Sequence, residues 1–307
     1  MGLSSCTFNA INQQEELNAN AIDAYIKTRN LTMQKSPEGL YYSIDRKNST
    51  GKQAFLTDLV KFHYVMTVMD GKKIDSTSRL KNQIKGMVWG ASSNIYNLPL
   101  SLMKEGEKGF FILPSALAFG GNSYADIPAY SVILLELEVV GIRTEAEQIQ
   151  DFQTTYKITN PEVTASGLVF KKLVTNPTGA VISAGQTVKV NYTGRFSYGV
   201  FQTDASNNVI YDSAFGSGTL TFVPGAGNLI AGFEEGILKM RVGEKAALIM
   251  PSKIAYGVNG NSTIPPNSPL YFAPATKLLN HGFCLHQNPY RLCTRPSRGK
   301  AVLAFAK

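Results

Sequence analysis

The sequence is poor in cysteine and in long apolar segments. Its three cysteines, Cys6, Cys284 and Cys293, lie near the two ends of the chain, so no disulfide framework holds the residues between them. No run of about eighteen apolar residues occurs, and the nearest, residues 131–142, is interrupted by two glutamates. A small disulfide-stabilised scaffold is therefore excluded, and no membrane-spanning helix is expected. With 307 residues and 44% hydrophobic content, two ordinary domains are expected instead.

Acidic residues are missing from the C-terminal end. Residues 273–307 contain six basic residues and no acidic one, which leaves 24 basic against 22 acidic residues in the rest of the chain. A nearly neutral body without a basic helix predicts no nucleic-acid partner. The change in composition sets residues 273–307 apart as a basic tail, either a genuine extension or the result of a change of reading frame or of added sequence.

The tail also contains residue types that bind zinc. His281, Cys284, His286 and Cys293 are spaced H-x2-C-x-H-x6-C, which matches none of the usual structural zinc patterns. We therefore expect no metal site.

Cys6 closes a short motif at the start of the chain. Leu3-Ser4-Ser5-Cys6 resembles the lipobox of bacterial lipoproteins, in which the cysteine thiol receives a diacylglycerol. The apolar segment that should precede it is absent, so either the sequence is truncated or the match is chance. The resemblance implies a lipid anchor at Cys6 and a location in a bacterial cell envelope, as a periplasmic or outer-membrane lipoprotein.

A long internal repeat dominates the sequence. ILPSALAFGGNSYADIPA at 112–129 returns as IMPSKIAYGVNGNSTIPP at 249–266, a spacing of 137 residues. Upstream, GLYY at 39–42 returns as GLVF at 167–170 with a spacing of 128, so the second copy contains nine additional residues. Two copies of more than a hundred residues predict tandem domains rather than a solenoid.

Within each copy the apolar pattern predicts mainly strands. Strands are expected at residues 109–113, 132–140, 186–192 and 245–250. One short helix is expected at 233–240, where Phe233, Ile237 and Met240 share a face. The predicted class is α+β, with a short helix packed across an antiparallel sheet in each domain.

Two more helices are predicted outside the repeats. Asn12 and Glu15 resemble a capping box that opens an N-terminal helix ending near Thr28, and Thr144 and Glu147 open a linker helix in the same way. The predicted divisions are 1–36 (lipobox-like segment and helix), 37–142 (first domain), 143–164 (linker helix), 165–272 (second domain) and 273–307 (tail).

Five motifs of the second repeat resemble one known family. VNYTG, YDSAF, NLIAGFEEGILKMRVGEK, IAYG and IPP follow the order found in FKBP-type peptidyl-prolyl cis-trans isomerases and cover nearly all of residues 165–272. The resemblance implies two FKBP-like domains, prolyl isomerisation that assists protein folding, and no cofactor. It also implies X-Pro segments of unfolded or extended polypeptides as substrates and rapamycin-like macrolides as ligands.

The chemistry of such a site needs neither a nucleophile nor a metal. Rotation about an X-Pro amide has a barrier of roughly 18 to 20 kcal/mol, because amide resonance is lost in the twisted state. An apolar pocket tolerates the less polarised twisted carbonyl better than the planar amide. Lowering the barrier by about 7 kcal/mol would give about five powers of ten in rate.

The resemblance assigns roles to nine residues. Those implied in catalysis are Tyr192, Asp212, Phe233 and Tyr256, and those implied in substrate binding are Tyr211, Leu229, Ile230, Ile264 and Phe272. Phe233 would form the floor under the proline, where many relatives have tryptophan, and Tyr256 would donate its hydroxyl to a substrate carbonyl. The arginine that often follows the aspartate has no counterpart here. Taken singly, such apolar residues are more often ordinary core; the ordered set of motifs favours the functional interpretation.

The first repeat departs from this pattern at most of the same positions. It keeps Tyr64, Asp75 and Ile127 but replaces the others with Ile74, Tyr96, Phe119, Leu135 and the pair Ser92-Ser93, and it has Pro99 in the helix. We therefore expect the first domain to keep the fold with little isomerase activity, and to serve in dimerisation, substrate capture or positioning. The alternative for the whole chain is a non-catalytic chaperone or adaptor that only holds proline-containing segments.

The end of the second repeat leaves one structural question open. The family continues after Phe272 with an acidic strand, whereas this chain continues with APATKLL. If that strand is missing, the second sheet has an unpaired edge.

Overall fold

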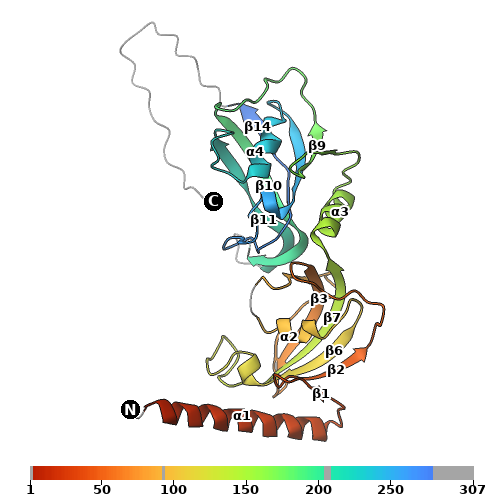
Figure 1. The fold of residues 1–307 in the computed structure, drawn as a ribbon, viewed down its shortest axis with the longest axis vertical. Helices are drawn as coiled ribbons and strands as arrows, with labels where there is room; N and C mark the ends of the chain where they lie inside the picture. Colours follow the sequence, from red (N-terminus) through yellow and green to blue (C-terminus); the bar gives the residue numbers. More distant parts are fainter. Residues whose placement is uncertain (1–2, 92–93, 204–208, 279–307) are drawn as a thin grey trace. The chain divides into compact units, whose positions relative to one another are not determined.

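The computed structural model describes residues 3–91, 94–203 and 209–278 (Figure 1). By their internal contacts these residues form two compact units. One contains the chain up to Gln148 together with Tyr198–Ser213, and the other contains Ile149–Ser197 and the chain from Ala214 onward. Each repeat forms its own antiparallel sheet with a short helix, so the predicted α+β class is confirmed.

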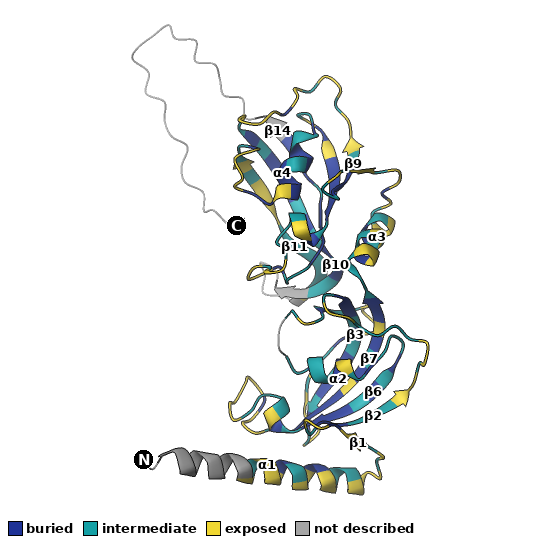
Figure 2. Ribbon diagram, viewed as in Figure 1, coloured by how far each residue is buried: buried dark blue, intermediate teal, exposed yellow. Residues whose placement is uncertain are grey.

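The first sheet has the strand order β1-β2-β6-β7-β3-β4, with β5 also paired to β3. Its strands are β1 (Gln34–Lys35), β2 (Tyr41–Arg46), β3 (Leu59–Val68), β4 (Lys73–Ser76), β5 (Lys85–Val88), β6 (Lys108–Leu113) and β7 (Ile133–Arg143), and a 3-10 turn, η1 (Ser115–Leu117), follows β6. Buried and partly buried residues alternate along β3 (Figure 2), as expected for a sheet with one core-facing side. That side carries Phe62 and Tyr64 and packs against α2 (Asn97–Ser101).

The opposite face of the first sheet is covered by the N-terminal helix, α1 (Leu3–Thr28). Ile22 of α1 is fully buried against Tyr41, Ile112 and Leu134, which alternate along their strands with the core-facing residues. The helix ends where predicted but begins at Leu3 rather than at Asn12. Residues 3–11 contain neither proline nor glycine, and an asparagine inside a helix costs only about half a kcal/mol, so nothing forces a start at Asn12.

The second sheet has the order β11-β10-β13-β12-β9-β8, with β14 paired to β10 and β12. Its elements are β8 (Glu162–Val163), β9 (Val169–Val174), β10 (Val188–Thr203), β11 (Val209–Phe222), α4 (Ala231–Leu238), β12 (Lys245–Met250), η2 (Ser252–Ile254), β13 (Leu270–Phe272) and β14 (Ala275–Leu278). β10 is longer than β3, and the nine additional residues of this repeat lie between the equivalents of Tyr64 and Asp75, so they extend the hairpin. β11 is longer than β4 because it continues without a break to Phe222, which corresponds to Lys85 in β5.

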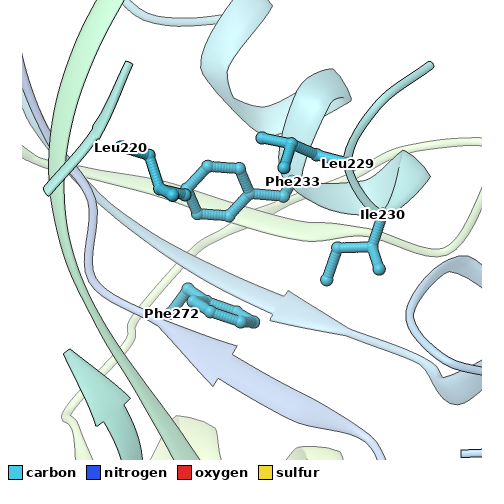
Figure 3. A pocket seen from close by; sticks show the side chains of 5 residues that line it. All are labelled: Leu220, Leu229, Ile230, Phe233 and Phe272. Carbon is cyan, nitrogen blue, oxygen red and sulfur yellow. The ribbon is translucent and has the colours of Figure 1, made fainter. Parts of the chain in front are cut away.

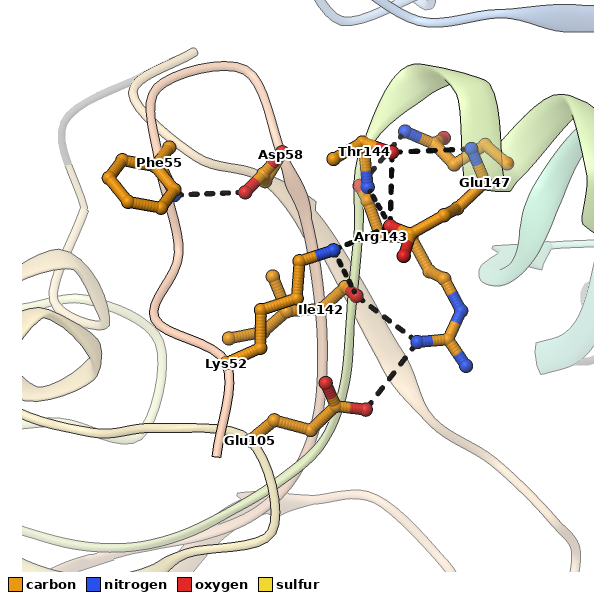
Figure 4. Close-up of polar contacts among 9 residues, drawn as sticks. Lys52, Phe55, Asp58, Glu105, Ile142, Arg143, Thr144 and Glu147 are labelled. Atoms are coloured by element: carbon orange, nitrogen blue, oxygen red, sulfur yellow. Dashed lines mark hydrogen bonds and ion pairs between the residues drawn. The ribbon is translucent and has the colours of Figure 1, made fainter. Parts of the chain in front are cut away.

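The linker helix, α3 (Glu145–Thr155), begins at the predicted capping box (Figure 4). The Glu147 carboxylate accepts from the Thr144 backbone N–H at 2.7 Å, and the Thr144 hydroxyl accepts from the Glu147 N–H at 3.3 Å. Lys52 pairs with the same carboxylate at 2.5 Å and donates to the Ile142 carbonyl at 3.3 Å. The start of α3 is thereby tied to the first unit through side-chain and backbone contacts.

The C-terminal half of α3 belongs to the second unit and packs on the second sheet. Phe152 is buried against Val169, Ile249 and Tyr271, and the Tyr156 ring stacks on Tyr271 with centroids 4.0 Å apart. This face of the second sheet is therefore covered by α3.

The strand that the sequence left in doubt after Phe272 is present. β14 follows β13 after a break at Pro274, and it pairs with β10 from Asn191↔Ala275 to Val188↔Leu278. Proline has no N–H to donate to the ladder, so the strand is interrupted and then resumes. The Pro274 carbonyl still accepts a hydrogen bond from the Ala246 N–H at 3.1 Å. The departure from the acidic family pattern therefore does not remove the strand.

Two further expectations concern membrane-spanning helices and metal sites. No helix within the described ranges is long and apolar enough to cross a membrane, and within the same ranges no cluster of metal-binding side chains occurs. The zinc-like residues His281, Cys284, His286 and Cys293 lie outside the described residues.

Candidate functional site: an apolar cup in the second domain

Helix α4 brings the predicted floor residue against the second sheet. Phe233 lies in its first turn and is 2% exposed. One turn later Gly236 faces β12, where an added Cβ would lie 2.6 Å from the side chain of Leu248. A glycine is required there for this close approach. The corresponding residue of the first domain is Pro99, and the helix that contains it, α2, has five residues where α4 has eight.

Three aromatic rings meet at the base of the site. The Phe233 and Phe272 centroids are 5.3 Å apart at 72°, and Tyr192 meets Phe233 edge-on at 6.3 Å and 82°. Tyr192 also lies 6.1 Å from Phe272. Such edge-to-face contacts are favourable for aromatic quadrupoles and fix the ring orientations. The structure thus brings together three of the predicted residues from β10, α4 and β13.

A small, open apolar pocket lies above Phe233 and Phe272 (Figure 3). Its lining is formed by Leu220, Leu229, Ile230, Phe233 and Phe272, all apolar. Leu229 and Ile230 precede α4 and are 8% and 7% exposed, so the predicted wall is present. The side chains that line the pocket are all apolar, and an aromatic ring forms its floor. Such a pocket suits a proline ring better than a charged side chain.

Two wall residues were not predicted from the sequence. Leu220 lines the cavity, and Phe222 packs against Phe233 with centroids 6.1 Å apart. Both lie on β11, two residues apart, and therefore face the same side of the sheet. The alternation of polar and apolar residues in TLTF, residues 219–222, was the sequence signal that could have identified these two residues.

Tyr256 and Ile264 lie in the loop after β12. Ile264 is 2% exposed, and its backbone N–H is held by the Asn261 side chain at 2.7 Å. Tyr256 is half-buried; burial, with a smaller contribution from the nearby Tyr192, raises the pKa of its phenol. The hydroxyl therefore stays protonated at neutral pH and can act as a hydrogen-bond donor.

Two predicted residues, Tyr211 and Asp212, belong by contacts to the first unit. The Tyr211 hydroxyl donates to the Ile84 carbonyl at 2.5 Å and accepts from the Ile84 N–H at 2.9 Å. The Asp212 carboxylate accepts from the Ser213 N–H at 2.7 Å. The roles assigned to both residues by resemblance stay predictions.

A buried carboxylate organises the loop that carries the wall residues. Glu234 is 7% exposed and accepts backbone N–H bonds from Gly225 at 2.8 Å, from Leu229 at 3.1 Å and from Gly227 at 3.4 Å. Charge-assisted bonds of this kind are among the stronger hydrogen bonds in proteins. Glu234 was not predicted, because it is the first of two adjacent glutamates on the helix, and acidic residues are mostly exposed.

The first domain has a different set of side chains at the equivalent place. The Tyr64 hydroxyl donates to the Asp75 carboxylate, and the Tyr64 and Tyr96 rings are 5.3 Å apart. Tyr96 takes the position of Phe233, and burial is the largest cause that raises the pKa of both tyrosines. Phe119, which replaces Tyr256, stacks on Tyr124 at 5.7 Å. The first-domain cup, as we call the cluster of Tyr64, Asp75 and Tyr96, therefore has a phenol at the floor position, where the second domain has the apolar ring of Phe233.

Comparison with known proteins gives consistent results. The sequence profile of the FKBP-type peptidyl-prolyl cis-trans isomerases matches residues 51–140 and again 179–273. The chain is 30% identical over 220 residues to "Peptidyl-prolyl cis-trans isomerase FKBP9" of Rattus norvegicus, which covers 70% of this chain and 34% of the relative. It is 43% identical over 96 residues to "FK506-binding protein 1B" of Neurospora crassa, covering 31% of this chain and 83% of the relative.

Among solved structures, the crystal structure of the three FKBP domains of wheat FKBP73 aligns with 80% of this chain and 98% of that chain, at 18% identity and a TM-score of 0.35. The chain spans about a third of the length of relatives such as FKBP9. Because the family profile matches twice and covers more than half of its residues, the chain belongs to the FKBP-type peptidyl-prolyl cis-trans isomerase family, with one family domain in each repeat.

Proposed function

We propose that this chain is a peptidyl-prolyl cis-trans isomerase that assists protein folding, and that its second domain carries the catalysis. The observation that supports this most directly is the apolar cavity above Phe233, with Leu229 and Ile230 as its wall. We assign the proline ring of a substrate to this pocket, with the amide to be rotated at its rim. Removing the amide from water favours the twisted, less polarised state over the planar one.

The polar groups beside the cavity orient the substrate chain. The protonated Tyr256 hydroxyl donates to a substrate carbonyl, and this bond holds the chain while the amide rotates. Tyr192 closes the side of the cup against Phe233 and Phe272. In this proposal Asp212 acts as the matched family carboxylate, and Tyr211 as a substrate contact reached from β11.

A protease-coupled assay on a short X-Pro peptide tests the assignment to the second domain. Phe233→Ala opens the floor of the cup and is expected to lower kcat/KM at least tenfold, which corresponds to about 1.4 kcal/mol of transition-state stabilisation. The matched change in the first domain, Tyr96→Ala, is expected to keep most of the activity. An equal loss in both variants, with both proteins folded by circular dichroism, would contradict the assignment.

The first domain has a separate role in this proposal. Its cup lacks the apolar wall and the tyrosine at position 119, so we assign it substrate capture or positioning, with dimerisation as the alternative role. If the full chain suppresses aggregation of an unfolded protein but has no isomerase activity, the non-catalytic chaperone or adaptor is the correct function. Inhibition of isomerisation by a rapamycin-like macrolide, lost in Phe233→Ala, supports the enzyme.

The resemblance of Leu3–Cys6 to a lipobox supports a second proposal, a lipid anchor at Cys6 and a location in a bacterial cell envelope. The rat and Neurospora relatives named above are eukaryotic and lend it no support. Incorporation of labelled palmitate into the wild-type chain but not into Cys6→Ser, after expression in a bacterium, is the expected result. Equal labelling of both, or of neither, would refute it.

A further inference from the structure

A lysine faces the cup of the first domain. Lys85 on β5 pairs with Phe62 on β3, so the two side chains project from the same face of the sheet. The Lys85 ammonium lies 5.3 Å from the ring centroid of Tyr96 and 5.6 Å from that of Tyr64. In the second domain the equivalent residue is Phe222, whose ring closes the wall beside Phe233. The first cup thus holds a cation where the second has an aromatic ring.

This ammonium is only partly compensated. Burial is the main effect on its pKa, which is lowered, and Asp75 raises it by a smaller amount. The Asp75 carboxylate is itself engaged, since it accepts from the Tyr64 hydroxyl and from the Ser76 N–H at 2.8 Å. Among the described residues Lys85 takes part in no ion pair. The faces of two tyrosine rings stand in for a counter-ion, in the manner of a cation–π contact.

We propose that the first-domain cup is a binding site for proline-containing segments that carry a carboxylate directly before the proline, and that Lys85 is the residue that selects them. This rests on the proposed function in so far as the first domain captures substrate. The proposed selection does not depend on Ser92 and Ser93, which lie outside the described residues. The ligand is thus an acidic polypeptide segment, in contrast to the uncharged segments that suit the apolar second cup.

The selection follows from what each ligand does to the ammonium. A proline ring stacked on Tyr96 must share or displace the cation, and a neutral segment offers nothing in exchange for the lost ring contacts. A carboxylate beside the proline forms a charge-assisted hydrogen bond with the displaced ammonium in a partly dehydrated site, where such bonds are stronger than in water. Acidic segments are favoured and basic ones are opposed by like charge.

The chain contains a local reporter for this site. Its single tryptophan, Trp89, directly follows β5 and packs against the core of the first domain, while the second repeat has none. Changes in tryptophan emission therefore report binding at the first domain. The full chain is titrated with two peptides that differ only in Glu-Pro or Gln-Pro, at low salt. We expect the Glu-Pro peptide to bind about tenfold more tightly.

Two substitutions at one position complete the test. Lys85→Met keeps the length of the side chain and removes the charge, and it should reduce the preference for Glu-Pro to less than twofold. Lys85→Arg keeps the charge and should retain most of the preference. Raising the salt concentration should weaken Glu-Pro binding to the wild type and leave Gln-Pro binding unchanged.

The inference is overturned if the wild type binds both peptides equally, if neither peptide alters the emission of Trp89 or binds by calorimetry, or if Lys85→Met keeps the full preference. These outcomes are separate from the proposed isomerase activity, which is measured on an uncharged X-Pro peptide. Isomerisation without Glu-Pro selection refutes only the role of Lys85. Glu-Pro selection without isomerisation refutes only the catalytic assignment.

Discussion

Glu234 illustrates that a residue outside the cavity can determine its shape. Its carboxylate accepts from three alternate backbone N–H groups, those of Gly225, Gly227 and Leu229, in the loop that ends in Leu229 and Ile230. The first domain has Asn97 at the equivalent position, together with two serines in place of the wall. The loss of the carboxylate and the loss of the apolar wall therefore occur in the same copy.

We expect Glu234→Ala to damage both stability and activity. Leaving these N–H groups unpaired should lower the free energy of unfolding by about 1 to 3 kcal/mol. Displacement of the wall should lower kcat/KM about tenfold, as measured with an X-Pro peptide under conditions where the variant is folded. Glu235→Ala, which removes a carboxylate bonded to the Ser166 hydroxyl at 2.6 Å, is the control and should leave the activity within twofold. Equal effects of the two changes would argue against a special role for Glu234.

The two loop aromatics, Tyr256 and Phe119, give a reciprocal test. Tyr256→Phe removes one hydrogen bond to the substrate carbonyl and is expected to slow isomerisation about threefold to tenfold, in keeping with about 1 kcal/mol for such a bond. Phe119→Tyr restores the hydroxyl in the first domain but not the apolar wall. In a Phe233→Ala background it should add no measurable activity, and a clear gain would show that the hydroxyl alone limits the first cup.

At the scale of residues, sequence motifs were informative only where the family pattern names a position. Tyr192, Phe233 and Phe272 were placed by resemblance and meet in the structure. Leu220 and Phe222 were missed because β11 continues seven residues past the motif YDSAF, beyond any position that the family pattern names. Whether a strand residue faces the cup or the solvent depends on register, and register is fixed by pairing with β10, which the local sequence does not specify.

At the scale of elements, the start of α3 depends on a reciprocal cap. Thr144→Ala removes the hydroxyl that accepts from Glu147 N–H, and it should lower the free energy of unfolding by about 1 kcal/mol. Thr154→Ala, in the last turn of the same helix, replaces a hydroxyl that bonds only the Gln150 carbonyl and should be neutral or slightly stabilising. Denaturant unfolding followed by circular dichroism measures both. A larger loss from Thr154→Ala would contradict the cap.

Strand β7 carries a carboxylate that makes the first domain sensitive to acid. Glu138 is paired with Arg79 and, at 2.8 Å, with Arg46, and these arginines hold the pKa of its carboxyl at about 2. Because the folded pKa lies below the ordinary value of about 4.3, this contribution to stability is present above pH 4.3 and is lost as the pH falls toward 2. The arginines are half exposed, so we expect about 1 to 2 kcal/mol rather than the full shift.

The measurement compares wild type with Glu138→Gln. Unfolding of the first domain is followed by Trp89 emission at pH 6 and pH 3. Because pH 3 is still above the folded pKa of about 2, the wild type should lose roughly half of this contribution over the interval, about 0.5 to 1 kcal/mol more than the variant. The difference between the two proteins should therefore narrow at the lower pH. An equal loss in both would show that other carboxylates account for the acid sensitivity.

One wrong prediction and one open question about the elements have different physical origins. The start of α1 was placed at a capping box that the helix does not use, because a good local cap signal does not end a helix that can continue on its N-terminal side. The strand after β13 was doubted because its side chains differ from the family pattern. Strand pairing is made by the backbone, so Ala275 and Thr276 join the ladder as readily as acidic residues would.

At the scale of the whole molecule, each sheet has its own covering helix. Ile22 of α1 contacts Tyr41, Ile112 and Leu134, and Phe152 of α3 contacts the residues at the equivalent positions of the second sheet. The short strands β1 and β8 pair with β2 and β9 in the same register. The structural repeat is therefore longer than the sequence repeat, in which both helices had been left outside the domains.

This predicts where the second domain can be separated. A fragment of residues 144–278 keeps Phe152 and Tyr156 on Tyr271, whereas a fragment of residues 165–278 leaves that face bare. Loss of a buried phenylalanine alone costs about 3 to 5 kcal/mol, so the shorter fragment should unfold at much lower denaturant concentration, or not fold at all. In the longer fragment, Phe152→Ala should reproduce most of the defect. Equal stability of the two fragments would show that the helix contributes little.

The placement of these helices also bears on ancestry. If the ancestral gene segment that was copied had contained only the sheet and its short crossing helix, the second copy would have arrived with a bare hydrophobic face. Since β7 ends at Arg143 and α3 begins at Glu145, the helix of the second copy follows the last strand of the first with one residue between them. Duplication of a segment that starts with the helix yields two self-sufficient modules at once, and further copies could be added in the same way without an intermediate that exposes apolar surface.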